Sequence, residues 1–86
     1  MPRISEFYGI AIYMYYRDHA PPHFHAIYGE FEAEIAIASA EMTVGDLPHR
    51  ARSLVTDWAK IHRDELQANW DLARQAQPLI PIDPLD

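Results

Sequence analysis

The stretch HFHAIYGEFEAEIAIA, from His23 to Ala38, decides the fold. It contains two runs of strand-forming residues, 23–28 and 31–38, and the second alternates between apolar and polar positions. Gly29-Glu30 separates the two runs, and glycine at the first position of a two-residue loop is typical of a type II′ hairpin turn. The stretch therefore predicts an antiparallel β-hairpin.

The register of this hairpin follows from counting outward from the turn. Phe24 then pairs with Ile35 on an apolar face, as expected for the buried side of a sheet. The other face carries His23, His25 and Glu34, with His25 directly opposite Glu34. The remaining predicted pairs are Tyr28 with Phe31, Ile27 with Glu32, Ala26 with Ala33, and His23 with Ala36.

Two further strands are expected beside the hairpin. The run FYGIAIYMYY, 7–16, is apolar on both parities, which is typical of a central strand with material packed on each face. Pro21-Pro22 cannot join a strand ladder and marks a rigid connection from this run to 23–28. A short fourth strand is expected over 41–44, ended by Gly45.

A helix is predicted over 47–75, capped at Asp46, because apolar residues recur there at helical spacing. The tail 76–86 contains three prolines and is expected to lie extended. The sequence therefore predicts a single α+β domain over residues 1–86. Its architecture should be a three- or four-stranded, mainly antiparallel sheet with one long C-terminal helix packed on it.

Composition narrows the class of protein. The 86 residues include no cysteine, which excludes disulfides and thiolate metal sites and fits a cytoplasmic protein. A formal net charge of −6 argues against nucleic acid as a partner, because phosphate neutralisation supplies most of that affinity. The sequence shows no signal peptide and no apolar run of about 18 residues, so we expect no membrane association. So short a chain has a thin core, and we expect a homo-oligomer that covers both faces of the sheet.

Three of the five histidines surround the proline pair in RDHAPPHFHA, 17–26. Residues two apart on a strand point the same way, about 6.5–7 Å apart, so His23 and His25 can converge on one ion or water. With His19 they form a candidate site for a divalent metal such as zinc. His23 and His25, together with Asp18, are also the candidate catalytic acid–base groups.

Candidate binding residues lie around these histidines. They are Arg17, His19, Glu34 and His62. Glu34 can hold an imidazole tautomer from across the hairpin. His62 lies one helical turn from Trp58, so it is either a hydrogen-bonded core residue or a side chain that points to the histidine strand. The alternative for the whole group is structural, since a His–Glu pair across strands is ordinary sheet stabilisation worth less than about 1 kcal/mol.

The same residues resemble the signature of a small bacterial family, the domain of unknown function 4160. Its signature, I-x-M-Y-x-x-D-H-x-P-P-H-F-H, corresponds to residues 12–25. A later pattern, W-x-x-x-H-x-x-E-L-x-x-N-W, corresponds to residues 58–70. The resemblance covers nearly the whole chain, from Pro2 to Pro84.

The resemblance implies a function only in outline and supplies no catalytic residues. Members of this family are often encoded beside a second small protein, and the pair resembles a toxin–antitoxin module. A first hypothesis is therefore a cytoplasmic component of such a pair, which acts by protein–protein binding. A second is a small histidine- or metal-dependent hydrolase or ribonuclease that uses His19, His23 and His25. A third is a structural metal-binding domain, so the sequence leaves open whether the protein is an enzyme.

Overall fold

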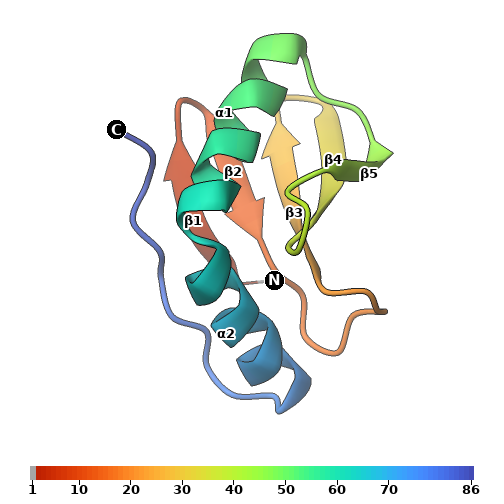
Figure 1. Ribbon diagram of the computed structural model, residues 1–86, viewed down its shortest axis with the longest axis vertical. Coiled ribbons are helices and arrows are strands. Elements are labelled where there is room, and N and C mark those ends of the chain that lie inside the picture. The colour runs from red at the N-terminus through yellow and green to blue at the C-terminus, as the bar shows by residue number, and fades with distance from the viewer. Residues whose placement is uncertain (1) are drawn as a thin grey trace.

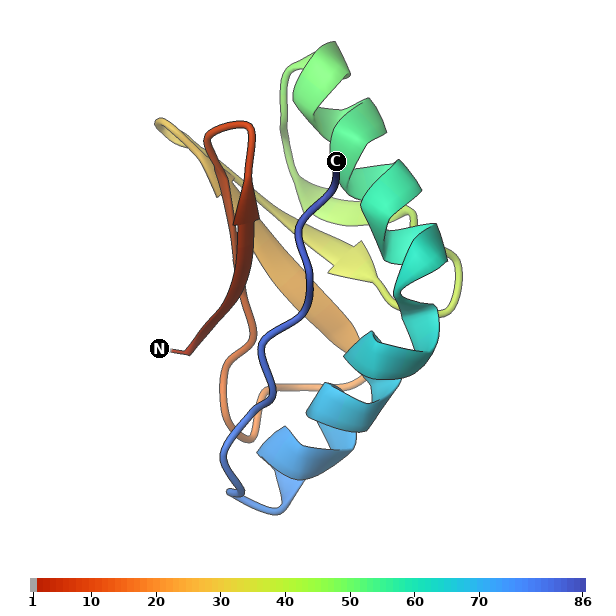
Figure 2. The same cartoon turned by 90° about the vertical axis from the view of Figure 1, so that its left-hand side faces the viewer.

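The computed structural model describes residues 2–86 and places a five-stranded sheet against two helices (Figures 1 and 2). The elements are β1 (Arg3–Phe7), β2 (Ile10–Tyr13), β3 (His23–Tyr28), β4 (Phe31–Ala36), β5 (Met42–Gly45), α1 (His49–Ile61) and α2 (Arg63–Arg74). Each strand pairs antiparallel with its neighbour along the chain, in the order β1-β2-β3-β4-β5. Both helices lie on one face of the sheet, and we call the opposite side the outer face.

The predicted hairpin is confirmed as β3 and β4. All six predicted pairs are present, including Phe24 with Ile35 and His25 with Glu34. Gly29 adopts a φ of 59°, as the first central residue of a type II′ turn requires. The apolar parity of both strands is buried against the helices, so the polar parity faces outward.

The prediction of one central strand over 7–16 is wrong. The chain turns at Tyr8-Gly9, where φ is 50° and 79°, so this region supplies the end of β1 and all of β2. Positive φ suits glycine, but the aromatic residues around Gly9 conceal the turn in the hydrophobic pattern. The sheet therefore has five strands rather than three or four, and β1 lies at its edge.

The boundaries after the hairpin also differ from those expected. β4 ends at Ala36 rather than at 38, because the chain turns there: the N–H of Ala36 donates to the carbonyl of Glu41 at 2.9 Å. Ala40 adopts a φ of 60° in this turn, although nothing in its side chain favours that conformation. β5 consequently begins at Met42 and includes Gly45.

One long helix over 47–75 is also wrong. The backbone of His62, with φ −108° and ψ 25°, leaves the helical region and divides the segment into α1 and α2. The bend turns both halves toward the same core, since Trp58 before it and Leu66 after it are fully buried. A continuous apolar stripe in the sequence does not report such a bend, because the helical spacing is kept on both sides.

The cap predicted at Asp46 is wrong as well. Pro48 precedes the first residue of α1, and the carboxylate of Asp46 instead accepts a hydrogen bond from the N–H of Leu47 at 3.0 Å. Proline suits the start of a helix, where its missing N–H would have no partner anyway. Within residues 2–86, neither helix is long and apolar enough to cross a membrane.

The core lies between the sheet and the helices. Phe24 of β3 and Trp58 of α1 are both fully buried, with their ring centroids 5.7 Å apart in an edge-on arrangement. The ring of Phe7 in β1 also packs against Trp58, with the ring centroids 5.3 Å apart. Trp58 therefore packs against both the edge strand β1 and the central strand β3.

The tail after α2 runs along the open side between β1 and the helices (Figure 2). The side-chain amide of Asn69 donates to the carbonyl of Ile80, and its oxygen accepts from the N–H of Ile80, both at 2.8 Å. Further along, the N–H of Ile82 donates to the carbonyl of Ile4 at 2.8 Å. The tail is therefore anchored both to α2 and to the edge strand.

Candidate metal centre

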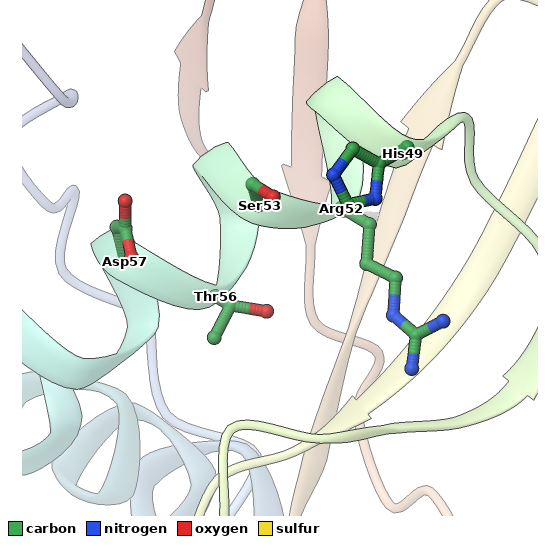
Figure 3. Close-up of a pocket in the computed structure, with 5 residues that line it drawn as sticks. All are labelled: His49, Arg52, Ser53, Thr56 and Asp57. Atoms are coloured by element: carbon green, nitrogen blue, oxygen red, sulfur yellow. The ribbon is translucent and has the colours of Figure 1, made fainter.

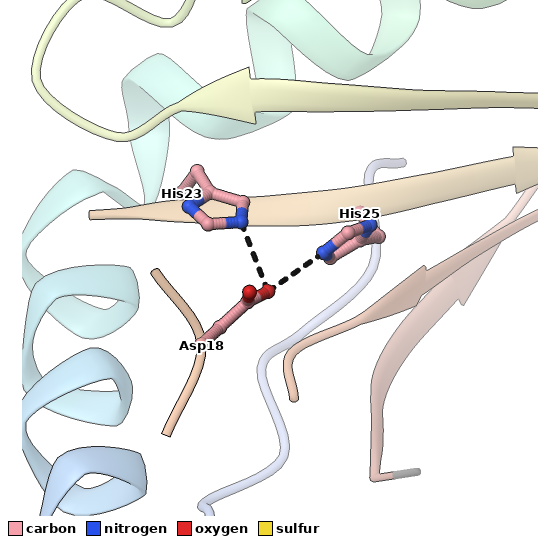
Figure 4. A group of neighbouring side chains, drawn as sticks. All are labelled: Asp18, His23 and His25. Carbon is pink, nitrogen blue, oxygen red and sulfur yellow. Dashed lines mark hydrogen bonds and ion pairs between the residues drawn. The ribbon is translucent and has the colours of Figure 1, made fainter. Parts of the chain in front are cut away.

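β3 positions two histidines on the outer face of the sheet. Phe24 between them points into the core, so His23 and His25 point the opposite way. Both are nevertheless buried, with 3% and 7% of their surface exposed, because the loop 14–22 folds over this end of the outer face. Figure 4 shows Asp18 on that loop, aimed at both imidazoles.

The carboxylate of Asp18 joins the two imidazoles. Its Oδ2 lies 3.0 Å from Nε2 of His23 and 3.0 Å from Nε2 of His25. The ring of His19 stacks on that of His23 with the ring centroids 4.6 Å apart. The ring of Trp70 in α2 also packs against His23, with the ring centroids 5.3 Å apart. Neighbours from the loop and from α2 therefore hold the His23 ring in place.

The second nitrogen of His23 decides where its proton lies. Nδ1 lies 2.8 Å from the carbonyl oxygen of Pro21, which can only accept, so Nδ1 carries a proton. A neutral His23 then presents an unprotonated Nε2 to Oδ2 of Asp18, and two acceptors 3.0 Å apart repel each other. The contact is favourable only when a proton or a metal cation lies between these two atoms.

The second ring nitrogen of His25, unlike that of His23, lacks a hydrogen-bond partner within residues 2–86. Its Nδ1 is buried and has no hydrogen-bond partner among the described residues, while Oε2 of Glu32 lies 3.5 Å away. A metal ion on Nε2 would leave the proton on Nδ1, on the side of the Glu32 carboxylate. Histidines that bind metals usually donate their second N–H to a carboxylate or a carbonyl. His23 with Pro21 fits this arrangement, and Glu32 is a carboxylate on the correct side of His25, although 3.5 Å is longer than a good hydrogen bond.

A second group of potential ligands shares one nitrogen with the first. Oε1 of Glu34 lies 3.5 Å from Nε2 of His23 and 3.6 Å from Nε2 of His19. An imidazole nitrogen binds one ion only, so this group and the group of Asp18, His23 and His25 are two sides of one site. We call the five residues Asp18, His19, His23, His25 and Glu34 the histidine cluster.

The spacing of the histidine cluster fits a divalent transition metal. Ligands about 2.0–2.1 Å from a tetrahedral Zn²⁺ lie about 3.3 Å from one another. The nitrogen–oxygen distances in the cluster run from 3.0 to 3.6 Å for these pairs. The side chains of His23 and His25 are 3% and 8% exposed and those of Asp18 and Glu34 are 17% and 20% exposed, whereas that of His19 is 64% exposed. The cluster therefore has a closed side and an open side.

The surroundings of Asp18 keep it ionised. Burial raises the pKa of this carboxyl, but a hydrogen bond from His25 and one from the backbone N–H of His19 lower it. The charges of His23 and His25 lower it further, so the pKa of Asp18 lies below its ordinary value. A carboxylate that stays charged is the form that binds a metal ion.

Two predicted binding residues lie apart from the cluster. Arg17 precedes Asp18 in the loop but is exposed, and it pairs with no carboxylate in residues 2–86. His62 lies at the junction of α1 and α2, where its ring is 5.5 Å from that of Trp58 and its Nδ1 binds Glu65. The structure brings together the other predicted residues, from both the catalytic and the metal-binding sets.

Three contributors to the site were missed in the sequence. They are the carbonyl of Pro21, the ring of Tyr15, which lies 4.2 Å from that of His25, and Trp70. Strand alternation reports neighbours on one face of the sheet, whereas these groups come from a loop and a helix. The one available signal was the proline pair directly before the histidine strand, which marked this backbone as rigid.

The polar side chains that line other hollows in the described chain converge less than those of the histidine cluster. One of about 290 Å³ on the exposed side of α1 is lined by His49, Arg52, Ser53, Thr56 and Asp57. Figure 3 shows these side chains spread along the helix, with Asp57 at one end and His49 at the other. A cavity of about 210 Å³ instead adjoins the histidine cluster, and its lining includes His19, His23 and Glu34. It combines a hollow with candidate metal ligands.

Comparison with known proteins gives one family and no individual relative. No significant match was found among curated proteins or among solved structures. The family model described as "Domain of unknown function (DUF4160)" matches residues 9–71, a span that contains the whole histidine cluster. The chain therefore belongs to the DUF4160 family.

Proposed function

We propose that the chain is a metal-binding domain that holds one divalent transition-metal ion, such as Zn²⁺, on Asp18, His23 and His25. The observation that carries this proposal is the pair of contacts made by His23. Its Nδ1 donates to the carbonyl of Pro21, so its Nε2 offers a lone pair toward Asp18 at 3.0 Å. A cation between Nε2 and the carboxylate converts a repulsive contact into a favourable one.

A proton on Nε2 of His23 is the competing explanation. It satisfies His23 and Asp18, but it leaves the buried Nδ1 of His25 without a partner. An ion bound by both Nε2 atoms accounts for both histidines at once, because it places the remaining proton of His25 on Nδ1, near Glu32. The ion therefore explains more of the geometry than the proton does.

The test is a calorimetric titration of the chelator-treated protein with Zn²⁺. We expect one ion per chain, and a loss of affinity of at least about 100-fold in Asp18→Asn and in His25→Ala, because each removes a ligand. Asp18→Asn keeps the shape of the side chain, so it guards against a variant that fails to fold. Circular dichroism would confirm that each variant retains the wild-type fold.

His49→Ala is the matched control for this titration. His49 is exposed at the start of α1 and belongs to neither group of potential ligands. Its replacement should leave the affinity unchanged. A folded wild type that binds no Zn²⁺, or an equal loss of affinity in His49→Ala, would contradict the proposal.

We propose, second, that the chain is one component of a toxin–antitoxin-like pair. Its support is the outer face, which the helices leave uncovered and where Tyr13 and Ile27 are only half-buried. A net charge of −6 favours a basic partner, and a cytoplasmic location belongs to the same proposal. Co-expression with the small protein of a neighbouring gene should give a complex that survives purification and growth arrest in only one of the single expressions. Absence of both effects would remove this idea.

We also propose a homo-oligomer, although the structure supports it with fewer observations than the sequence did. An apolar, proline-rich tail can dock on its own domain or on a partner, and here it docks on its own chain, where Ile82 is buried and Leu79 packs against the core. The uncovered outer face is the remaining support. Light scattering at high micromolar concentration decides the point, and a monomeric mass there would end the proposal.

A further inference from the structure

We infer that the histidine cluster is a hydrolytic site for small neutral acyl compounds, in which Glu34 takes a proton from an ion-bound water. This inference rests on the proposed metal site. Asp18, His23 and His25 supply three ligands on the closed side of the cluster. An ion with three protein ligands keeps a position for water or substrate, which is typical of catalytic rather than structural zinc sites.

The open side of the cluster faces a cavity. Its volume is about 210 Å³, below the range of about 300–1,000 Å³ that is usual for pockets that bind larger ligands. Its lining consists of His19, Ala20, Pro21, His23, Glu34, Ala36, Thr43 and Val44. The site can therefore admit a small group, with apolar walls on one side and the ion's open position on the other.

Glu34 lines this cavity and also lies beside the nitrogen that His23 would offer to the ion. Its Oε1 is 3.5 Å from Nε2 of His23 and 3.6 Å from Nε2 of His19, and both distances are too long for good hydrogen bonds. The carboxylate is therefore free to accept a proton. β4 holds it directly across from His25, so its place depends on the hairpin register and not on a mobile loop. A carboxylate beside an ion-bound water is the usual general base of metal-dependent hydrolysis.

The charge of the cavity selects the class of substrate. Neither lysine nor arginine is among its lining residues, although these are the side chains that recognise phosphate. Two carboxylates, Asp18 and Glu34, would repel a phosphate group at the ion. An uncharged ester meets neither obstacle, so the chemistry favours acyl transfer to water over cleavage of RNA.

The proposed step is the hydrolysis of an ester. The water oxygen bonds to the carbonyl carbon while Glu34 accepts one of its protons, and the ion stabilises the negative charge on the carbonyl oxygen. The carbon–oxygen bond to the alcohol then breaks, and the leaving oxygen takes the proton back from Glu34. Ester and water become carboxylic acid and alcohol, with no oxidation or reduction.

The experiment compares p-nitrophenyl acetate with bis(p-nitrophenyl) phosphate on the Zn²⁺-loaded protein, with the metal-free protein as blank. We expect saturable hydrolysis of the ester and only background cleavage of the phosphate diester. Glu34→Gln should lower kcat by about 100-fold or more, while the Zn²⁺ affinity stays within about threefold. Glu30→Gln is the matched control, because Glu30 is exposed in the hairpin turn and lines no part of the cavity.

A spectroscopic measurement separates binding from turnover. The Co²⁺-loaded protein should change its visible spectrum when acetohydroxamic acid is added, because this small acyl compound binds an open position of a metal ion as its hydroxamate anion. A wild type that binds no metal would refute both the metal site and this inference. Metal binding without ester hydrolysis, or without the spectral change, would overturn the hydrolytic inference alone.

Two further outcomes also overturn the inference. A loss of Zn²⁺ affinity of more than about tenfold in Glu34→Gln would make Glu34 a ligand and the site a closed one. Faster cleavage of the phosphate diester than of the ester would contradict the substrate class.

Discussion

His23 shows how one residue connects the sheet to the loop. The hairpin register places it on the outer face, and its Nδ1 then reaches back two residues to the carbonyl of Pro21. Pro21 and Pro22 fix two consecutive φ angles, so little conformational freedom is lost when this carbonyl orients the ring. The lone pair of Nε2 is thus directed before any ion arrives, which is the preorganisation that a binding site needs.

Tyr15 offers a test of the acidic surroundings at the scale of one residue. In the metal-free protein, burial raises the pKa of Tyr15, and the carboxylates of Glu32 and Asp18 raise it further. A pKa raised on folding contributes stability that is fully present below the unfolded value of about 10 and is lost as pH rises through the folded value. The free energy of unfolding should therefore fall more steeply above pH 10 in the wild type than in Tyr15→Phe.

Urea denaturation at several alkaline pH values would measure this difference. Tyr8→Phe is the matched control, because Tyr8 is 56% exposed at a turn and should keep the wild-type slope. Identical slopes for the wild type and Tyr15→Phe would show that neither burial nor the two carboxylates raise the pKa of this phenol.

At the scale of elements, two glycines at positive φ allow a matched comparison. A Cβ on Gly29 meets nothing within 4 Å, whereas a Cβ on Gly45 would lie 2.2 Å from the carbonyl oxygen of Glu32 in the neighbouring strand. Gly29→Ala should cost about 1–2 kcal/mol for its left-handed backbone alone. Gly45→Ala should cost about 1–3 kcal/mol more, because β5 must shift away from β4. Urea denaturation of both variants measures this difference in the free energy of unfolding. Equal losses of stability would show that β5 can shift away from β4 at no energetic cost.

The anchoring of the tail can be tested at Asn69. This side chain is 1% exposed and makes two hydrogen bonds to the backbone of Ile80. Asn69→Asp removes the donor and turns a carboxylate toward the carbonyl of Ile80, so stability should fall by about 1–3 kcal/mol. Gln77→Glu makes the same chemical change at an exposed position and should alter stability by less than about 0.5 kcal/mol. A small effect in Asn69→Asp would mean that apolar contacts alone hold the tail.

The elements that could be predicted from the sequence are those whose signals are local. Alternation and Gly29 were enough for the β3–β4 hairpin and its register. The turn at Tyr8-Gly9 was not recognised, because apolar residues continue through it on both parities. The break at His62 depends on how two helical halves meet one core, and no spacing in the sequence encodes that.

The candidate site likewise contains residues that could be predicted from the sequence and residues that could not. The register alone brought together His23, His25 and Glu34, and the proline pair pointed to Asp18 and His19 nearby. The loop 14–22 and α2 supply the rest, and their paths are set by tertiary packing. This is why Trp70, 47 positions after His23 (70 − 23), could not be connected with the site beforehand.

At the scale of the whole molecule, the proposed ion would tie the loop 14–22 to the sheet, since Asp18 comes from the loop and the histidines from β3. An ion that binds only the folded state at 100 times its Kd adds about 2.7 kcal/mol, which corresponds to about 10–20 °C in Tm for a chain of this size. Thermal melts with and without Zn²⁺ should show this rise in the wild type and not in Asp18→Asn. A rise of equal size in both proteins would place the bound ion elsewhere.

The tail gives the molecule a kinetic property as well. Every strand pairs with its neighbour in sequence, so the sheet forms through short loops, whereas the bond between Ile4 and Ile82 joins residues 78 apart (82 − 4). Closing so long a loop is expected after the rate-limiting step of folding. Asn69→Asp should then leave the folding rate nearly unchanged and raise the unfolding rate about 5- to 150-fold, which is the signature of a contact absent from the transition state. Stopped-flow measurements would show the tail prolonging the lifetime of the native state without hastening its formation, and a slower folding rate in the variant would contradict this.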